Sequence, residues 1–169
     1  MPGPPRTTIY IGLGSNVGPR EDNLRRALRL LGERGAPVRR VSSFYLSEPV
    51  GYDDQPFFYN AVARISWTGA ATRLLSAIRR IERRLGRVPT FRNGPRLIDI
   101  DLLDVAGAVR ARPDPVLPHP RLSDRRFVLV PLAEIAPSWR HPVTGLTAAE
   151  MLARLARKPM VRRIPNRKS

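Results

Sequence analysis

The chain has 169 residues, no cysteine, and 30 Lys and Arg residues against 14 Asp and Glu, which gives a formal net charge of +16. Its length and its hydrophobic fraction of 42% predict one folded domain with its own core and exclude a disordered protein. No apolar run approaches the roughly 18 residues of a membrane-spanning helix, and without cysteine a metal would need oxygen or histidine ligands.

Three elements are predicted in the first third of the chain. Residues 7–13 (TTIYIGL) have the composition of a strand, and the glycine-rich GSNVG that follows predicts a tight turn before a helix. Residues 21–35 repeat leucine and alanine at the spacing of one helical face, and Gly35 ends that helix. Residues 38–46 (VRRVSSFYL) predict a second strand, followed by a loop rich in turn residues.

Strands and helices continue through the middle of the chain. Residues 57–66 (FFYNAVARIS) alternate as a third strand, and residues 70–86 predict a second amphipathic helix. After a loop at residues 87–95, the stretch 96–105 (RLIDIDLLDV) predicts a fourth strand, and a return through VRAR (109–112) predicts a hairpin.

The C-terminal part carries smaller elements. Residues 127–136 predict a short helix, and Thr147 with Glu150 has the spacing of a capping box, so a last helix begins near Ala148. The order β-α-β-β-α-β predicts an α+β fold with a ferredoxin-like core, a mainly antiparallel sheet flanked by helices as an α/β/α sandwich. We expect a single catalytic domain over residues 1–169, with flexible termini at about 1–6 and 160–169.

Two carboxylates interrupt the fourth strand. Asp99 and Asp101 are two residues apart, so they project from the same face with Cα atoms roughly 6.5–7 Å apart, while Ile98, Ile100 and Leu102 face the core. Two partly buried carboxylates at this spacing repel each other unless a cation lies between them. The alternative is a solvent-facing strand edge whose acids pair with nearby arginines.

The basic charge requires an anionic partner, and the sequence alone leaves its class open. All but two of the basic residues are arginines, whose planar guanidinium suits phosphate and carboxylate. Arg87, Arg92 and Arg96 surround the Asp pair, as an enzyme for a phosphorylated small molecule would require. The rivals are an RNA-binding protein and a metal-dependent D-x-D nucleotide-sugar transferase, although no P-loop or RNP motif is present.

The segment RNGPRLIDIDLL resembles the signature of the 6-hydroxymethyl-7,8-dihydropterin pyrophosphokinase family. The similarity extends to YIGLGSNVGPREDNLRRAL, VSSFYLSEPVGYDDQPFFYNAV, RIERRLGRV and LPHPRLSDRRFVLVPLAEIAP in the family's order, which is nearly all of residues 8–137. The resemblance implies a kinase of folate biosynthesis that transfers pyrophosphate from ATP to the hydroxymethyl group of a reduced pterin and releases AMP. It also implies two Mg²⁺ ions, with ATP and the pterin as partners. From the composition we expect a cytoplasmic protein, and we further expect a monomer with no membrane or nucleic-acid partner.

The resemblance assigns roles to particular residues. It implies that Asp99 and Asp101 hold the metal and, with Arg87 and Arg96, form the catalytic set. It places an ATP-binding group at Glu82, Arg87, Arg92, Arg96, Leu102, His119 and Arg125. It places a pterin-binding group at Ser47, Val50, Phe58, Asn60, Asp99 and Phe127.

Several of these positions have a structural alternative or depart from the family pattern. Glu82 could instead pair with Arg79 within its helix, and Phe58 and Phe127 could be core residues. Asn93 stands where a tryptophan precedes the Gly-Pro-Arg turn in well-known relatives, and Pro89 replaces a further arginine. We therefore expect retained activity with altered affinities.

Overall fold

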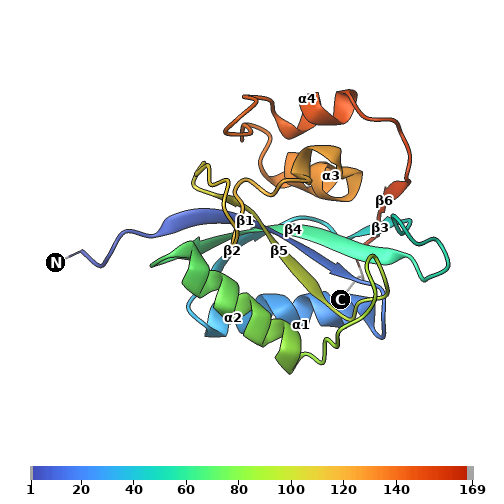
Figure 1. The fold of residues 1–169 in the computed structure, drawn as a ribbon, viewed down its shortest axis with the longest axis horizontal. Coiled ribbons are helices and arrows are strands. Elements are labelled where there is room, and N and C mark those ends of the chain that lie inside the picture. The colour runs from blue at the N-terminus through green and yellow to red at the C-terminus, as the bar shows by residue number, and fades with distance from the viewer. Residues whose placement is uncertain (1, 167–169) are drawn as a thin grey trace.

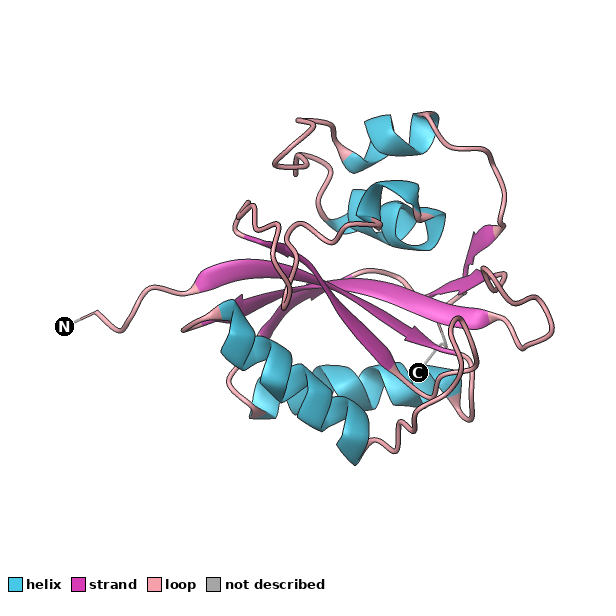
Figure 2. Ribbon diagram, in the orientation of Figure 1, coloured by secondary structure: helices cyan, strands magenta, loops and turns pink. Residues whose placement is uncertain are grey.

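The computed structural model describes residues 2–166. A sheet of six strands lies between two layers of helices (Figure 1, Figure 2). The elements in chain order are β1 (Thr7–Ser15), α1 (Arg20–Glu33), β2 (Val38–Val41), β3 (Tyr45–Ser47), β4 (Phe58–Trp67), α2 (Ala71–Arg84), β5 (Asp99–Val105), the 3-10 turn η1 (Leu122–Asp124), α3 (Arg126–Ile135), α4 (Ala148–Ala153) and β6 (Val161–Arg163).

The sheet has the predicted ferredoxin-like topology. The strand order is β5-β1-β4-β3-β6, with β2 also paired to β4, and all of these pairs are antiparallel. Helices α1 and α2 cover one face, and α3 and α4 cover the other (Figure 1). The prediction of an α+β fold arranged as an α/β/α sandwich is therefore confirmed.

Each face of the sheet buries its own apolar cluster, because successive strand residues point to opposite sides. Ile9, Ile11 and Leu13 of β1 face α1 and α2, as do Ile100 and Leu102 of β5. The opposite cluster joins Tyr10, Val62 and Leu103 to the inner residues of α3 and α4. The alternation thus leaves Asp99 and Asp101 on the side of α3.

The second predicted strand is divided in two. Val41 is paired with Ala63 and Tyr45 with Asn60, so β2 and β3 are joined through a bulge that contains one extra residue. The Ser42 hydroxyl stabilises the bulge by accepting a hydrogen bond from the Val62 N–H at 3.0 Å. The prediction of one continuous strand over residues 38–46 was wrong for this reason.

Three other predictions require correction. The strand at the N-terminus continues through the glycine-rich segment to Ser15, so the turn begins later than expected. Residues 109–112 form no strand, because only a single bridge joins Arg110 to Leu117. The expected flexible C-terminus contains β6, which is hydrogen-bonded to β3; residues 167–169 lie outside the described part.

The short helices begin within one residue of the predicted positions. Helix α3 starts at Arg126 and includes Pro131, and its Glu134 accepts hydrogen bonds from the Ser43 N–H and the Tyr45 hydroxyl. Thr147 caps α4 by accepting from the Glu150 N–H at 3.2 Å, as the capping-box spacing predicted. Between residues 2 and 166, no helix is long and apolar enough to cross a membrane.

Candidate active site

The two carboxylates of β5 lie beside a strand that carries no side chains at the facing positions. In the register of β1 and β5, Gly14 is opposite Asp99 and Gly12 is opposite Asp101. All four residues line one cavity between the sheet and α3. The glycines leave the floor of this cavity open, so a ligand can approach both carboxylates.

Asp99 is held by two guanidinium groups. Its Oδ1 accepts a hydrogen bond from Arg87 Nη1 and its Oδ2 accepts one from Arg96 Nη1, each at 3.0 Å. Arg87 is itself paired with Glu82, a buried residue of α2 whose carboxylate also accepts from the Ile100 N–H. Burial raises the pKa of Glu82 despite the nearby Arg87 charge. Glu82 therefore fixes Arg87 against the end of β5.

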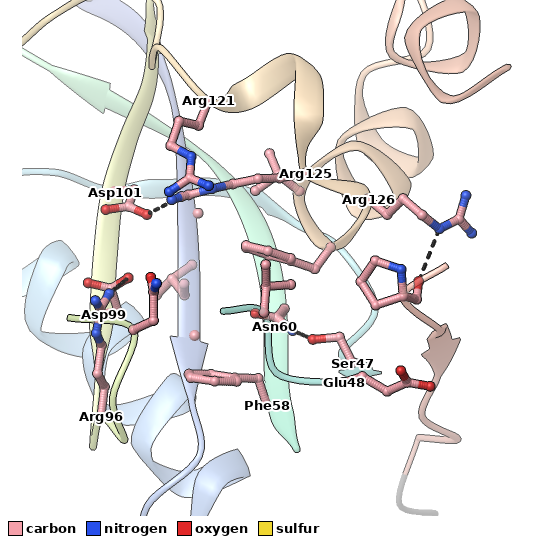
Figure 3. Close-up of a pocket in the computed structure, with 18 of the residues that line it drawn as sticks. Ser47, Glu48, Phe58, Asn60, Arg96, Asp99, Asp101, Arg121, Arg125 and Arg126 are labelled. Atoms are coloured by element: carbon pink, nitrogen blue, oxygen red, sulfur yellow. Dashed lines mark hydrogen bonds and ion pairs between the residues drawn. The ribbon is translucent and has the colours of Figure 1, made fainter. Parts of the chain in front are cut away.

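Asp101 has weaker support. Within residues 2–166 its single ion pair is with Arg125 Nη1 at 3.4 Å, and Arg125 lies just before α3. Burial, and after it the charge of Asp99, raise the pKa of Asp101 to about 7. Arg121 and Arg125 extend from the same segment toward this carboxylate (Figure 3). The negative pair therefore lies among basic side chains, and Asp101 is the less compensated of the two acids.

His119 lies close to these arginines as a neutral imidazole. Its Nδ1 accepts a hydrogen bond from the Arg121 N–H at 3.1 Å, which assigns the proton to Nε2. Burial, followed by the charge of Arg125, lowers the pKa of His119 to about 4. At neutral pH, His119 can therefore donate one hydrogen bond from Nε2.

Aromatic and amide side chains form the other end of the cavity. Phe58 and Asn60 project from β4, Ser47 from β3, and Phe127 from the first turn of α3. Asn60 Nδ2 donates to the Ser47 hydroxyl, which fixes the amide and leaves its oxygen free to accept (Figure 3). This end can therefore hold a flat heterocycle that has hydrogen-bonding edges.

A buried asparagine joins two loops at the cavity. Asn16, just after β1, donates from Nδ2 to Gln55 Oε1 at 2.9 Å and accepts from the Arg96 N–H at 2.8 Å. Gln55 in turn donates to the Asn93 carbonyl at 2.7 Å, and Asn93 lines the cavity. Asn16 thus links the loop after β3 to the loop that carries Arg96.

The structure brings most of the predicted site residues to this cavity. Those that line it are Ser47, Val50, Phe58, Asn60, Arg96, Asp99, Asp101, Arg125 and Phe127. Arg87 and Glu82 stand behind Asp99, and Glu82 is not the partner of Arg79, which pairs with Asp114 at 2.9 Å. Arg92 is exposed on its loop, and the Leu102 side chain is buried on the opposite face of the sheet.

Sequence reasoning did not identify several residues of the cavity. They are Gly12, Gly14, Glu48, Arg121, Asp124, Arg126 and Pro159, and outside the lining Asn16 holds the loop that carries Arg96. Two glycines spaced like the Asp pair within a strand were an available signal for a close ligand approach. No local pattern distinguishes Arg121 or Arg126 from the many other arginines.

The carboxylate pair suits a hard cation whose remaining ligands are water and substrate oxygens. Among residues 2–166, no group of three or more His, Cys, Asp and Glu side chains is placed to hold a metal by itself. Mg²⁺ in phosphate-transfer sites typically has one or two protein carboxylates and completes its shell with water and substrate oxygens. Asp99 and Asp101 beside an open floor fit such an ion, and the contact of Asp101 with Arg125, at 3.4 Å, is longer than the two contacts of Asp99.

The fold and the site together define a class of small α+β domain, in which a sheet presents two carboxylates and clustered arginines at one end of a cavity and aromatic side chains at the other. The chain belongs to the 7,8-dihydro-6-hydroxymethylpterin-pyrophosphokinase (HPPK) family, whose sequence profile matches residues 10–137. The family predicted from the sequence is thus confirmed.

Relatives of different length share this domain. A 2-amino-4-hydroxy-6-hydroxymethyldihydropteridine pyrophosphokinase of Bacillus subtilis is 44% identical over 127 residues, covering 75% of this chain and 76% of that protein. The protein of the same name from Methylorubrum extorquens is 43% identical, covering 88% and 94%. The folic acid synthesis protein FOL1 of Dictyostelium discoideum is 37% identical over 93% of this chain, which spans only 24% of that longer protein.

Solved structures have the same fold. A crystal structure of a Plasmodium falciparum HPPK-DHPS triple mutant with pteroate superposes with a TM-score of 0.68. The alignment covers 89% of this chain and 43% of that chain, at 14% sequence identity. At this identity the likeness concerns the fold alone.

Proposed function

We propose that this protein transfers the pyrophosphoryl group of ATP to the hydroxymethyl group of 6-hydroxymethyl-7,8-dihydropterin in folate biosynthesis, giving the dihydropterin diphosphate and AMP. The observation that carries the proposal is the division of one cavity into two chemically different ends. Asp99, Asp101 and the arginines form the end for a polyphosphate, while Phe58, Asn60 and Phe127 form the end for a heterocycle.

The polyphosphate end would bind the charge that develops during transfer. Arg96 and Arg125 reach the cavity from opposite sides, so they can neutralise phosphoryl oxygens on both sides of the reacting phosphorus. Asp99 and Asp101 would hold Mg²⁺, with two ions expected. When bound, this metal supplies charge neutralisation and lowers the pKa of the acceptor hydroxyl. Arg87 keeps Asp99 in place, and neutral His119 offers Nε2–H to a phosphate oxygen.

The heterocycle end would orient the acceptor. The free Asn60 oxygen can accept a hydrogen bond from a ring N–H or amino group, and the two phenyl rings can contact the faces of the ring. The hydroxymethyl oxygen would then lie near the carboxylates. It attacks the β-phosphorus while the bond from that phosphorus to the α–β bridging oxygen breaks, and the hydroxyl proton passes to solvent. Positioning of this kind supplies a large part of the rate in phosphoryl transfer.

A product assay tests the proposal. The protein is incubated with ATP, Mg²⁺ and 6-hydroxymethyl-7,8-dihydropterin, and the nucleotide products are separated. AMP formed in equal amount to a dihydropterin diphosphate is expected. Formation of ADP, or no turnover at any Mg²⁺ concentration, would contradict the proposal. Replacing Mg²⁺ with excess chelator is the matched control and should abolish the signal.

Two alternative functions can be distinguished from the proposed one, the first by the site and the second by the reaction product. An RNA-binding protein would not place two carboxylates at the centre of its basic surface, because they repel backbone phosphates. A nucleotide-sugar transferase would release a nucleoside diphosphate rather than AMP. Location in the cytoplasm and action as a monomer complete the proposal; a mass of 19.0 kDa by light scattering is the expected result for the monomer.

A further inference from the structure

The segment that follows α4 forms part of the cavity wall, although it lies beyond the residues that match the family. The chain descends from α4 to the edge of the sheet, where β6 pairs with β3 (Figure 1). Hydrogen bonds extend this pairing, from the Glu48 N–H to the Met160 carbonyl at 3.3 Å and from the Ile164 N–H to the Phe44 carbonyl at 2.8 Å. Pro159, just before the strand, lines the cavity together with Ser47 and Glu48.

This segment has open space on both of its sides. A second hollow lies behind it, lined by α4 residues and by Arg157, Lys158, Met160 and Val161. Glu48 and Arg126 border both hollows, so the segment is a thin partition between them. Because Pro159, Met160 and Val161 are only half-buried, the position of this partition depends strongly on its hydrogen bonds.

Arg126 is the side chain that ties this partition to the rest of the site. It is the first residue of α3, between Arg125 and Phe127, and its Nε donates to the Pro159 carbonyl at 3.2 Å (Figure 3). The bond joins the helix that carries Phe127 to the segment paired with the strand that carries Ser47. Phe127 and Ser47 both belong to the heterocycle end of the cavity.

We propose that Arg126 is a positioning residue for the acceptor: by holding the backbone at Pro159, it sets the distance between α3 and β3 across the heterocycle end. The inference rests on the proposed function, because it identifies that end as the acceptor site. Arg126 acts through the segment 158–163, whereas Arg96 and Arg125 act on the polyphosphate. Loss of Arg126 therefore weakens acceptor binding more than ATP binding.

Steady-state kinetics of Arg126→Ala test the first half of this inference. We expect the KM for the pterin to rise about five- to tenfold, the effect of losing one ordinary hydrogen bond, with KM for ATP and kcat changed less than about twofold. Arg126→Lys keeps a cationic donor and should recover part of the loss. Arg154→Ala removes the same charge at an exposed position that lines neither hollow, so it should leave both KM values unchanged.

A second pair of variants tests the route through the segment. Arg162 is opposite Leu46 in the β3–β6 register, and Arg162→Pro removes a backbone donor from that ladder, while Arg162→Ala removes only an exposed side chain. Arg162→Pro should raise the pterin KM as Arg126→Ala does, and Arg162→Ala should not. In the double variant Arg126→Ala/Arg162→Pro the effects should not multiply, because both act on one segment. Hydrogen exchange of residues 160–164 should increase in either single variant.

The outcomes separate this inference from the proposed function. Absence of pterin turnover by the unaltered protein contradicts the function, and the inference falls with it. If the unaltered protein turns over normally and Arg126→Ala has an unchanged pterin KM, the inference is wrong while the proposed function stands. The inference is also wrong if only the KM for ATP rises, because that would indicate direct contact of Arg126 with the nucleotide. Effects that multiply in the double variant would show that Arg126 and β6 act separately.

Discussion

At the scale of single residues, the two carboxylates of β5 differ in how the fold compensates their charge. Asp99 accepts hydrogen bonds from Arg87 and Arg96, each at 3.0 Å, whereas Asp101 has one longer pair with Arg125 at 3.4 Å. Burial and the neighbouring Asp99 raise the pKa of Asp101 to about 7. Asp99 is therefore an integral part of a network of ion pairs, whereas the charge of Asp101 is less well compensated.

Substitution of each acid by its amide should separate stability from activity. Both Asp99→Asn and Asp101→Asn should lower kcat by about a hundredfold or more, because both remove a carboxylate from the proposed metal site. Without added metal, Asp101→Asn should raise the free energy of unfolding by about 1 kcal/mol, since it removes a partly buried charge that Asp99 repels. Asp99→Asn should lower it by about 1 to 2 kcal/mol, since it leaves two arginines with weaker partners.

Urea denaturation of the metal-free variants, run beside the product assay, measures both quantities. Equal stability changes for the two amides would contradict the assignment of different environments. A variant with the activity of the unaltered protein would contradict the metal-binding role of that residue.

The lowered pKa of His119 determines the direction in which this residue makes the stability of the protein depend on pH. Its pKa falls from the ordinary 6.5 to about 4 because burial and the charge of Arg125 disfavour the imidazolium. As the pH falls below 6.5, the unfolded chain binds a proton that the folded chain refuses, so this contribution to stability is lost progressively between pH 6.5 and about 4. Above pH 6.5 the residue adds no pH dependence.

Proton NMR of the imidazole rings measures this prediction directly. The chain has two histidines, His119 and His141, and the pKa of His141 is also lowered, by burial. Neither ring should titrate near 6.5, and the resonance missing in His119→Gln assigns the one that titrates near 4. A midpoint of 6 or above for His119 would contradict the buried neutral imidazole. His119→Gln should also reduce the loss of unfolding free energy between pH 7 and pH 5.

At the scale of elements, β1 forms the cavity floor because its glycines alternate with its buried residues. Ile11 and Leu13 face the α1 and α2 core, so Gly12 and Gly14 face the ligand side. A methyl group at position 14 would lie 3.2 Å from Asn60 Oδ1 and 3.7 Å from the Phe58 ring. A methyl group at position 12 would meet only the Leu103 side chain, at 3.6 Å.

These two positions offer a matched pair of substitutions. Gly14→Ala should raise the KM for the pterin by about tenfold or more, because the methyl group displaces the Asn60 amide. Gly12→Ala should leave the pterin KM within about twofold, because its methyl group makes an ordinary contact on the side of Asp101. Both variants should keep the unfolding free energy within about 1 kcal/mol, since alanine is tolerated in a strand at least as well as glycine. Identical pterin KM values for the two variants would contradict the assignment of Gly14 to the heterocycle end.

Helix α2 contributes to the site indirectly. Its Glu82 lies in the last turn of the helix, pairs with Arg87 just beyond the helix end, and accepts a hydrogen bond from the Ile100 N–H of β5. A helix on one face of the sheet thereby orients an arginine that serves the carboxylates on the other face. The resemblance placed Glu82 near the nucleotide, and its observed contacts support a role through Arg87.

At the scale of the whole molecule, the net charge of +16 should favour the arrival of one of the two proposed substrates over the other. ATP with its metal remains anionic, whereas the pterin is uncharged, so long-range attraction acts only on the nucleotide. Raising the salt concentration from about 0.05 to 0.3 M should lower kcat/KM for ATP about threefold or more and leave the KM for the pterin unchanged. Initial rates at fixed free Mg²⁺ measure this effect, and an equal loss for both substrates would contradict it.

Local pattern was sufficient for much of the fold and for the centre of the site. The period of two in RLIDIDLL assigned Ile98, Ile100 and Leu102 to the core and both aspartates to the other face, as observed. Helical spacing identified α1 and α2, and the spacing of Thr147 and Glu150 located α4. These features are determined by neighbours within a few residues, so the sequence alone contains them.

Contacts between distant segments were decided only by the tertiary structure. Three such contacts are the pairing of β6 with β3, the hydrogen bond from Arg126 to Pro159 and the link through Asn16. The residues that they join are between 33 and more than 100 positions apart in the sequence. No periodicity in the sequence predicts which of the 28 arginines lie at the cavity, or which edge of the sheet pairs with the short basic strand β6. Both depend on which surfaces remain free once the two cores have packed. The sequence by itself thus determined the fold class, the family and the acidic pair, and packing decided which basic residues meet that pair and which segment closes the cavity.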